Sequence, residues 1–123
     1  MILGVGVDIE GVARMSAALA RHDGRLEARL FTHRERAYCR AKANSSQHFA
    51  ARFAAKEALL KALAVPEGLS WHELEIVNDD QGAPRFELTG VAAQAAAKLG
   101  IKKLHLSMSH AQDQAIAFVV AED

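Results

Sequence analysis

The chain has 123 residues, with 15 basic side chains, 15 acidic side chains and one cysteine. This length predicts one domain, residues 1–123, which buries roughly two thirds of the surface that its unfolded chain would expose. A single cysteine excludes an intrachain disulfide, and the sequence has neither a run of about 18 apolar residues nor the pattern of a signal peptide. We therefore expect a soluble, cytoplasmic protein that does not span a membrane.

The charges are unevenly distributed, although the net charge is zero. Residues 11–42 contain eight basic and three acidic side chains, and the rest of the chain carries the opposite excess. Such a segment indicates an anionic partner, which is an acidic protein, a membrane surface or a nucleic acid, unless it is only a solvated arginine-rich face. Nucleic acid is the weakest candidate because aromatic side chains that stack on bases are scarce there.

The first half of the chain predicts one strand followed by helices. Residues 2–9 are apolar and β-branched with two glycines, which is typical of a short buried strand that ends at Asp8. Thr-His-Arg-Glu at 32–35 has the form of a capping box. Helical spacing together with start and stop signals predicts four helices, at 12–21, 25–30, 33–42 and 44–64.

The last of these helices is the longest and carries charged residues within an apolar sequence. Asn44-Ser-Ser46 caps its start, and Pro66 and Gly68 close it. Glu57 and Lys61 lie one turn apart and share a face. Four apolar residues form an adjoining stripe: Phe49, Phe53, Leu60 and Leu63. This pattern predicts that the charged face lies at the edge of a core.

The second half of the chain changes to alternating patterns. A turn-rich segment at 78–84 joins two strands of a hairpin, and residues 110–114 join two more. The strands are expected at 73–77, 85–88, 102–109 and 115–121, with an alanine-rich helix at 91–99. The order of strand, helices, hairpin, helix and hairpin predicts an α+β fold, in which helices, one of them long, pack on a mostly antiparallel sheet.

Three polar residues stand in apolar contexts: Asp8 after the first strand, Glu57 on the long helix and His110 after a late strand. Two carboxylates in such places can hold a hard cation, for which Mg²⁺ is the natural candidate. Alternatively, Asp8 caps the following helix, Glu57 forms an ion pair with Lys61, and His110 is an ordinary turn histidine.

Further cationic residues extend this set. Arg52, Lys61 and His110 together would suit the phosphates of a ligand. Lys56 lies in the apolar stripe, and the simple interpretation is that its stem lies along the core while its ammonium reaches the solvent. Gly4-Val-Gly6 does not indicate a dinucleotide-binding loop, because no third glycine follows it.

Four segments resemble the holo-acyl carrier protein synthases, the small bacterial 4'-phosphopantetheinyl transferases. They are Gly4-Val-Gly-Val-Asp-Ile9 with Arg14, residues 31–39, residues 49–63, and Ser107-Met-Ser-His110. They cover essentially the whole chain in the right order. The resemblance implies the fold of that family and its reaction. This reaction transfers the 4'-phosphopantetheine arm of coenzyme A to a serine of apo-acyl carrier protein, in support of fatty acid biosynthesis, and releases adenosine 3',5'-bisphosphate.

The resemblance also implies roles for individual residues. Asp8 and Glu57 are expected to hold Mg²⁺ at the coenzyme A diphosphate, and Lys61 is expected to contact the same diphosphate, so these three form the catalytic group. Arg52, Ser109 and His110 are expected to bind coenzyme A, with Arg52 and His110 near the nucleotide phosphates. The acceptor of the serine proton stays open between a water held by the metal and one of the two carboxylates.

The resemblance also implies a partner for the basic segment at residues 11–42. Acyl carrier proteins are acidic, and Arg14 matches the family position that meets the carrier, with Arg21 and Arg25 as helpers by charge and spacing. Family members form trimers with coenzyme A sites between subunits, so the site residues need not come from one chain. A noncatalytic module that binds an acidic protein through its basic segment is the alternative.

One segment departs from the family. Its members commonly have a glycine-rich loop after the long helix, whereas this chain has the short Ala64-Val-Pro-Glu-Gly-Leu-Ser70. Only Gly68 is therefore carried over as a contact of coenzyme A.

Overall fold

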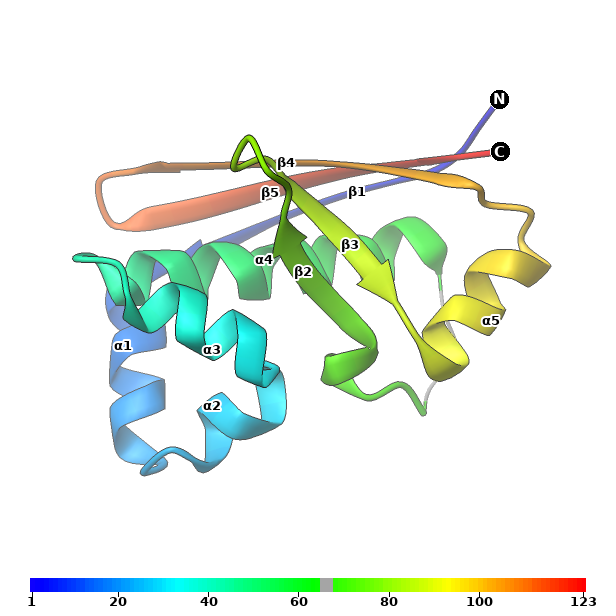
Figure 1. Cartoon of the computed structure of the whole chain (residues 1–123). Coiled ribbons are helices and arrows are strands. Elements are labelled where there is room, and N and C mark those ends of the chain that lie inside the picture. Colours follow the sequence, from blue (N-terminus) through cyan, green and yellow to red (C-terminus); the bar gives the residue numbers. More distant parts are fainter. Residues whose placement is uncertain (65–67) are drawn as a thin grey trace.

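A computed structural model describes residues 1–64 and 68–123 (Figure 1). The elements are β1 (Ile2–Gly11), α1 (Val12–Arg21), α2 (Arg25–Leu30), α3 (His33–Arg40), α4 (Ser45–Leu63), a 3₁₀ turn η1 (Trp71–Glu73), β2 (Leu74–Asn78), β3 (Pro84–Leu88), α5 (Gly90–Lys98), β4 (Lys103–Ala111) and β5 (Gln114–Glu122). The α+β class and the order of elements are confirmed. The antiparallel strands form two sheets rather than one, with the orders β1-β5-β4 and β2-β3, and η1 was not predicted.

Helix α4 runs along one face of the three-stranded sheet, while α1, α2 and α3 gather at one end of the molecule and α5 lies at the other (Figure 1). The β2-β3 hairpin covers a second side of α4, and its Leu74 and Ile76 share the core with Leu59 and Leu63 of the helix. Within the described residues, no helix is both long enough and apolar enough to cross a membrane.

The predicted charged face of α4 lies at the edge of the core, with Glu57 half-buried and Lys61 exposed, but the predicted apolar stripe is only partly correct. The helix lies in the middle of the molecule, and Phe53 and Leu60 of the expected stripe are only half-buried. Its alanines are buried instead: Ala50, Ala51, Ala54, Ala55, Ala58 and Ala62. Because the sheet and the hairpin cover different sides of the helix, no single stripe marks its buried face.

The two glycines of β1 allow that strand to lie directly on α4. A Cβ atom added to Gly6 would lie 1.8 Å from the carbonyl oxygen of Ala58, and one added to Gly4 would lie 2.0 Å from that of Ala62. The glycines therefore serve backbone packing, and this close approach brings the next inward-facing residue of β1, Asp8, against the helix.

Strand β1 is longer and less buried than predicted. It continues past Asp8 because its pairing with β5 extends to Gly11 opposite Gln114. Every second residue faces outward: Leu3, Val5, Val7 and Ile9 are between 41% and 55% exposed. Ile116 and Phe118 of β5 are exposed beside them. We refer to these six residues as the outer apolar face.

Several other boundaries also differ from the predictions. Strand β4 extends to Ala111, so His110 belongs to the strand and not to a turn, and Gln112, with a φ of 55°, lies in the tighter connection that follows. Helix α3 ends at Arg40 and not at Lys42. Helix α4 ends at Leu63, with Ala64 in a left-handed conformation. The predicted role of Pro66 in closing this helix lies outside the described residues.

Lys56 of α4 does not reach the solvent, contrary to the prediction. Its side chain is fully buried, and its ammonium donates three hydrogen bonds, to the Glu35 carboxylate at 2.7 Å and to the carbonyl oxygens of Leu30 and Trp71 at 2.9 Å each. Burial lowers the pKa of Lys56, and the Glu35 charge opposes this shift. The ammonium thus connects α4 with the end of α2 and with η1.

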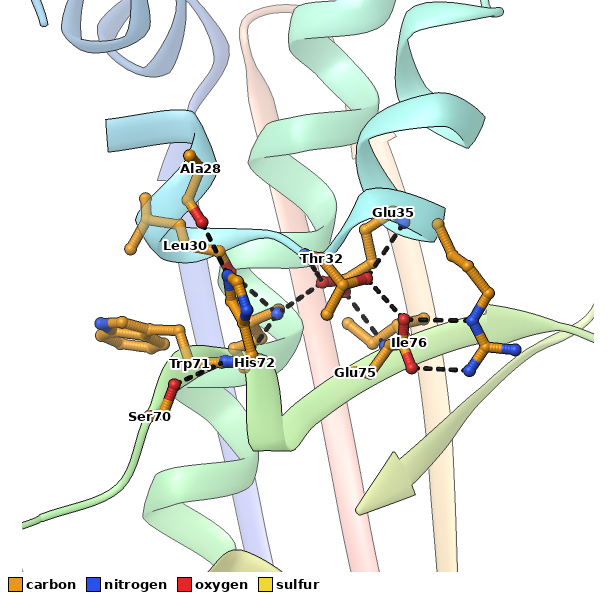
Figure 2. Close-up of polar contacts among 11 residues, drawn as sticks. Ala28, Leu30, Thr32, Glu35, Ser70, Trp71, His72, Glu75 and Ile76 are labelled. Carbon is orange, nitrogen blue, oxygen red and sulfur yellow. Dashed lines mark hydrogen bonds and ion pairs between the residues drawn. The ribbon is translucent and has the colours of Figure 1, made fainter. Parts of the chain in front are cut away.

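The Glu35 carboxylate completes this buried network (Figure 2). It accepts hydrogen bonds from the backbone N–H of Thr32 at 2.9 Å, which confirms the capping box, and from that of Ile76 in β2 at 3.0 Å. The buried ion pair is therefore hydrogen-bonded on both sides, as a charge out of contact with water requires.

Candidate functional site

The first group of site residues lies where β1 crosses α4. The Lys61 ammonium donates to the Val7 carbonyl oxygen at 2.9 Å and lies 3.3 Å from Oδ1 of Asp8. The expected alternative, an ion pair between Glu57 and Lys61, is not among the ion pairs of the described residues. Asp8 does not cap α1 either, because Asp113 accepts the hydrogen bond from the Ala13 N–H at 3.0 Å.

Three carboxyl groups influence one another at this crossing. Burial raises the pKa of Glu57, the Asp8 charge adds to the rise, and Lys61 opposes it. Burial also raises the pKa of Glu10 to about 8, and the neighbouring carboxyls of Asp8 and Glu57 contribute further. The sequence interpretation missed Glu10. Its signal was the spacing, because residues i and i+2 of a strand face the same side and Glu10 follows Asp8 by two positions.

A divalent cation fits this group. Oδ2 of Asp8 is buried and has no hydrogen-bond partner among the described residues, and a buried carboxylate oxygen without a partner is costly. In the part of the chain that the structure describes, no three His, Cys, Asp or Glu side chains converge as metal ligands. Mg²⁺ usually binds through one or two carboxylates and completes its shell with water and substrate phosphates, so Asp8 and Glu57 suffice as protein ligands.

The raised pKa of Glu10 predicts a specific dependence of stability on pH. Between about pH 4.5 and about pH 8, Glu10 is ionised in the unfolded chain and protonated in the folded one. The folded state therefore binds more protons than the unfolded state. The stabilisation that protonated Glu10 contributes is lost as the pH rises through this range. In metal-free buffer, Glu10→Gln should gain urea resistance relative to the wild type as the pH rises. Parallel pH profiles of the two urea midpoints would contradict this assignment.

The second group lies in a cavity of about 290 Å³ between α3, the start of α4, the hairpin and β4. Arg52 is 2% exposed; its Nη2 donates to Oδ1 of Asn78 at 2.6 Å, and its guanidinium carbon lies 4.1 Å from the centre of the Tyr38 ring. Its Nε has no partner among the described residues. Ser109 and His110 line the same cavity. A buried guanidinium with an unpartnered N–H at a cavity suits an anionic ligand.

The structure does not bring the two groups together in one chain. Arg52 and Glu57 are five positions apart on α4, which places their side chains roughly 140° apart around the helix. Their strand partners are also separated, because Asp8 lies on β1, His110 lies on β4 and β5 runs between them. Two strand spacings amount to roughly 10 Å. The expected cationic set is therefore divided, with Arg52 beside His110 and Lys61 beside Asp8.

Sequence reasoning also missed three residues of the second cavity: Tyr38 of α3, His48 of α4 and Asn78 of β2. Burial lowers the pKa of His48, and the charges of Arg52 and Lys42 add to this effect. No local pattern marks these residues, since they meet only in the folded chain.

The basic segment separates into paired and unpaired arginines. Arg34 pairs with Glu75 and Glu87, and Arg36 and Arg40 pair with Glu27. Four exposed arginines of α1 and α2 make no ion pair with the residues described here: Arg14, Arg21, Arg25 and Arg29. We refer to them as the basic surface. The positive excess of this segment is therefore concentrated on α1 and α2.

The basic surface borders a cavity of about 330 Å³. Arg14 and Arg29 line it together with Glu10, and apolar side chains such as Met15 and Phe53 form its wall. Arg21 follows Arg14 by seven positions on the same helix, which places both on one face. Arg29 was not among the predicted residues. Glu10 thus belongs both to the group of carboxyls at the crossing of β1 and α4 and to the wall of the cavity beside the arginines.

Gly68 lies apart from these contacts. Its φ of 102° favours glycine, and a Cβ atom there would meet no described atom within 4 Å. Its expected contact with coenzyme A stays a prediction.

The sequence is similar to that of known proteins over nearly its whole length. Residues 4–119 match the model of the 4'-phosphopantetheinyl transferase superfamily. The chain is 51% identical over 122 residues to the holo-[acyl-carrier-protein] synthase of Desulforudis audaxviator, covering 98% of this chain and 93% of that protein. It is 48% identical over 124 residues to that of Geobacter metallireducens, covering 99% and 98%.

Solved structures give the same result. The holo-[acyl-carrier-protein] synthase of Neisseria meningitidis superposes with a TM-score of 0.91 at 31% identity and covers 100% of both chains. That of Helicobacter pylori, in complex with coenzyme A, superposes with a TM-score of 0.83 at 32% identity, covering 96% of this chain and 99% of that one. The chain belongs to the holo-acyl carrier protein synthases of the 4'-phosphopantetheinyl transferase superfamily.

Proposed function

We propose that this protein transfers the 4'-phosphopantetheine arm of coenzyme A to a serine of apo-acyl carrier protein, which supports fatty acid biosynthesis. The serine oxygen forms a bond to the phosphorus that carries the arm, and the bond from that phosphorus to the bridging oxygen of the diphosphate breaks. Adenosine 3',5'-bisphosphate leaves with that oxygen, and the serine proton is released. The observation that carries this proposal is the buried, unpartnered oxygen of Asp8 beside Glu57 and Lys61.

The residues at the crossing of β1 and α4 suit the diphosphate. Asp8 and Glu57 would hold Mg²⁺, which when bound neutralises charge on the diphosphate. Lys61 is half-exposed, and its ammonium contacts Val7 and Asp8 among the described residues, so it can turn to a phosphate oxygen and stabilise the charge on the leaving group. Positioning and charge neutralisation are the main requirements of phosphoryl transfer.

The second cavity suits the nucleotide phosphates of coenzyme A. The unpartnered Nε of Arg52 and the imidazole of His110 are donors for these phosphates, and Ser109 lies at the same cavity. Since α4 separates this cavity from Asp8 within one chain, a complete site is best formed by two subunits. The outer apolar face offers an extended surface for the second copy. We propose a homotrimer with sites between subunits, the assembly that the family resemblance implies, and sedimentation of the protein alone tests this state.

The experiment that tests the activity mixes the protein with apo-acyl carrier protein, coenzyme A and Mg²⁺, and follows the carrier by mass spectrometry. The carrier should gain the mass of the phosphopantetheine arm, and a chelator should stop the gain. A carrier that binds the protein without gaining mass would instead support the noncatalytic module, whose binding weakens with salt.

Glu57→Ala tests the assignment of the metal. Removing residues that only orient metal ligands typically costs about 10–100-fold in metal affinity or activity, so loss of a ligand should lower the carrier-modification rate by at least about tenfold. Metal affinity, measured by titration with Mn²⁺, should fall in parallel. Normal turnover by Glu57→Ala would remove Glu57 from the metal site.

Arg14→Glu tests the basic surface as the docking site of the acidic carrier. Reversal of an exposed charge should slow association of the carrier and reduce the dependence of association on salt. The rate of transfer within the bound complex should stay nearly unchanged. Stopped-flow association with a labelled carrier measures this effect. Arg40→Glu is the matched control, because Arg40 pairs with Glu27 within the chain. If association of Arg14→Glu is unchanged, the carrier docks elsewhere.

A further inference from the structure

Gln47, in the first turn of α4, contacts the imidazole of His110 on β4. The two side chains meet at 2.7 Å between Nε2 of Gln47 and Nδ1 of His110. The residues are 63 positions apart in the sequence, and the contact joins the start of the central helix to the edge strand of the sheet. It was not expected from the sequence.

We propose that Gln47 is a positioning residue, which holds the His110 ring so that its Nε2 donates into the cavity beside Arg52. This inference rests on the proposed role of that cavity in binding the nucleotide phosphates of coenzyme A. Gln47 lies outside the cavity lining, whereas His110 lies within it. Gln47 therefore acts on the ligand through the histidine.

The chemistry of the contact fixes the tautomer of the ring. When the amide nitrogen of Gln47 donates to Nδ1, the proton of a neutral imidazole resides on Nε2. Nε2 lies on the side of the ring away from Gln47 and becomes a donor for an anion. Without the amide, an exposed histidine near the end of an edge strand can rotate and exchange tautomers, and the donor is lost for part of the time.

The cavity explains why this orientation matters. The Arg52 guanidinium is fixed by Asn78 and by the Tyr38 ring, so one side of the anion-binding cavity is rigid. His110 is exposed and has the Gln47 contact as its side-chain hydrogen bond among the described residues. A second donor in a fixed position lets both groups bind one phosphate without ordering a side chain on binding.

Nitrogen NMR of the full chain with labelled histidines tests the contact directly. The spectrum reports which ring nitrogen of His110 carries the proton, and His110→Ala assigns the signals. The wild type should show the proton on Nε2, and Gln47→Leu should show a mixture of tautomers. Gln94→Leu is the matched control, because Gln94 is an exposed glutamine of another helix, α5. A tautomer unchanged in Gln47→Leu would overturn the proposal.

Calorimetric binding of adenosine 3',5'-bisphosphate tests the consequence. A hydrogen bond of ordinary strength corresponds to an affinity loss of about 2- to 10-fold in Gln47→Leu, with no loss in Gln94→Leu. In the His110→Ala background, Gln47→Leu should have no further effect. An equal loss in both backgrounds would show that Gln47 does not act through His110. If His110→Ala binds the bisphosphate as well as the wild type, the proposed nucleotide role of His110 fails, and the positioning role fails with it.

Discussion

Glu35→Gln is expected to lower the free energy of unfolding by about 3–5 kcal/mol, the range for removing one partner of a buried ion pair. The change leaves the Lys56 ammonium fully buried without a counter-charge. It also replaces one of the two carboxylate oxygens that accept hydrogen bonds from the backbone N–H groups of Thr32 and Ile76 with an amide nitrogen, which cannot accept. Urea denaturation of the wild type and the variant measures the difference.

Two further variants separate burial from charge in this prediction. Glu87→Gln breaks the exposed ion pair with Arg34 and should cost less than about 1 kcal/mol, because solvent screens such pairs. The double variant Glu35→Leu/Lys56→Met should be more stable than Glu35→Gln, since it removes both buried charges together. A loss below about 1 kcal/mol in Glu35→Gln would show that the pair contributes no more than a surface contact.

Gly6→Ala is expected to destabilise the protein by about 3 kcal/mol or more, at or above the usual range for overpacking. The added methyl group would lie 1.8 Å from the Ala58 carbonyl oxygen, which is backbone and cannot rotate away. Strand β1 must then move off α4. Because Asp8 is the next inward-facing residue of β1, metal affinity should fall together with the thermal midpoint.

Gly11→Ala provides the matched control on the same strand. A Cβ atom at that position would lie 3.4 Å from the nearest atom, Cβ of Arg14, which is an ordinary van der Waals contact, and the φ of −77° suits alanine. Its thermal midpoint should stay close to that of the wild type. A Gly6→Ala variant as stable as Gly11→Ala would contradict the close packing of β1 on α4.

Local signals in the sequence predicted the positions of helices and strands better than the burial and tertiary contacts of those elements. The capping box at 32–35 and the start of the long helix depend on neighbouring residues, and both are confirmed, although Asn44 precedes that helix without a side-chain capping hydrogen bond. The burial of α4 could not be predicted, because alanine fits a helix equally well in water and against a sheet. Lys56 shows the same limit, since its counter-charge, Glu35, lies 21 positions earlier in the chain.

The residues of the candidate site likewise differ in whether local sequence or only the folded chain identifies them. Asp8, Glu57 and His110 were marked by polarity within apolar segments, which is visible in one sequence. Glu10 could have been found from its spacing to Asp8. Tyr38 and Asn78 could not, because they come from different elements and contact Arg52 only after folding. The contact between Lys61 and Asp8 likewise depends on the crossing of β1 and α4.

The alternation of residues along β1 has a consequence for how this protein can evolve. Residues 3, 5, 7 and 9 belong to the outer apolar face, while residues 4, 6, 8 and 10 face the helix and include the carboxylates Asp8 and Glu10. Insertion or deletion of one residue in this strand would exchange the two sets, placing carboxylates among apolar side chains and large side chains against the α4 backbone. Point substitutions can change either surface separately, but a single-residue change in strand length alters both at once. We therefore expect the spacing between Gly4 and Glu10 to tolerate no length variation.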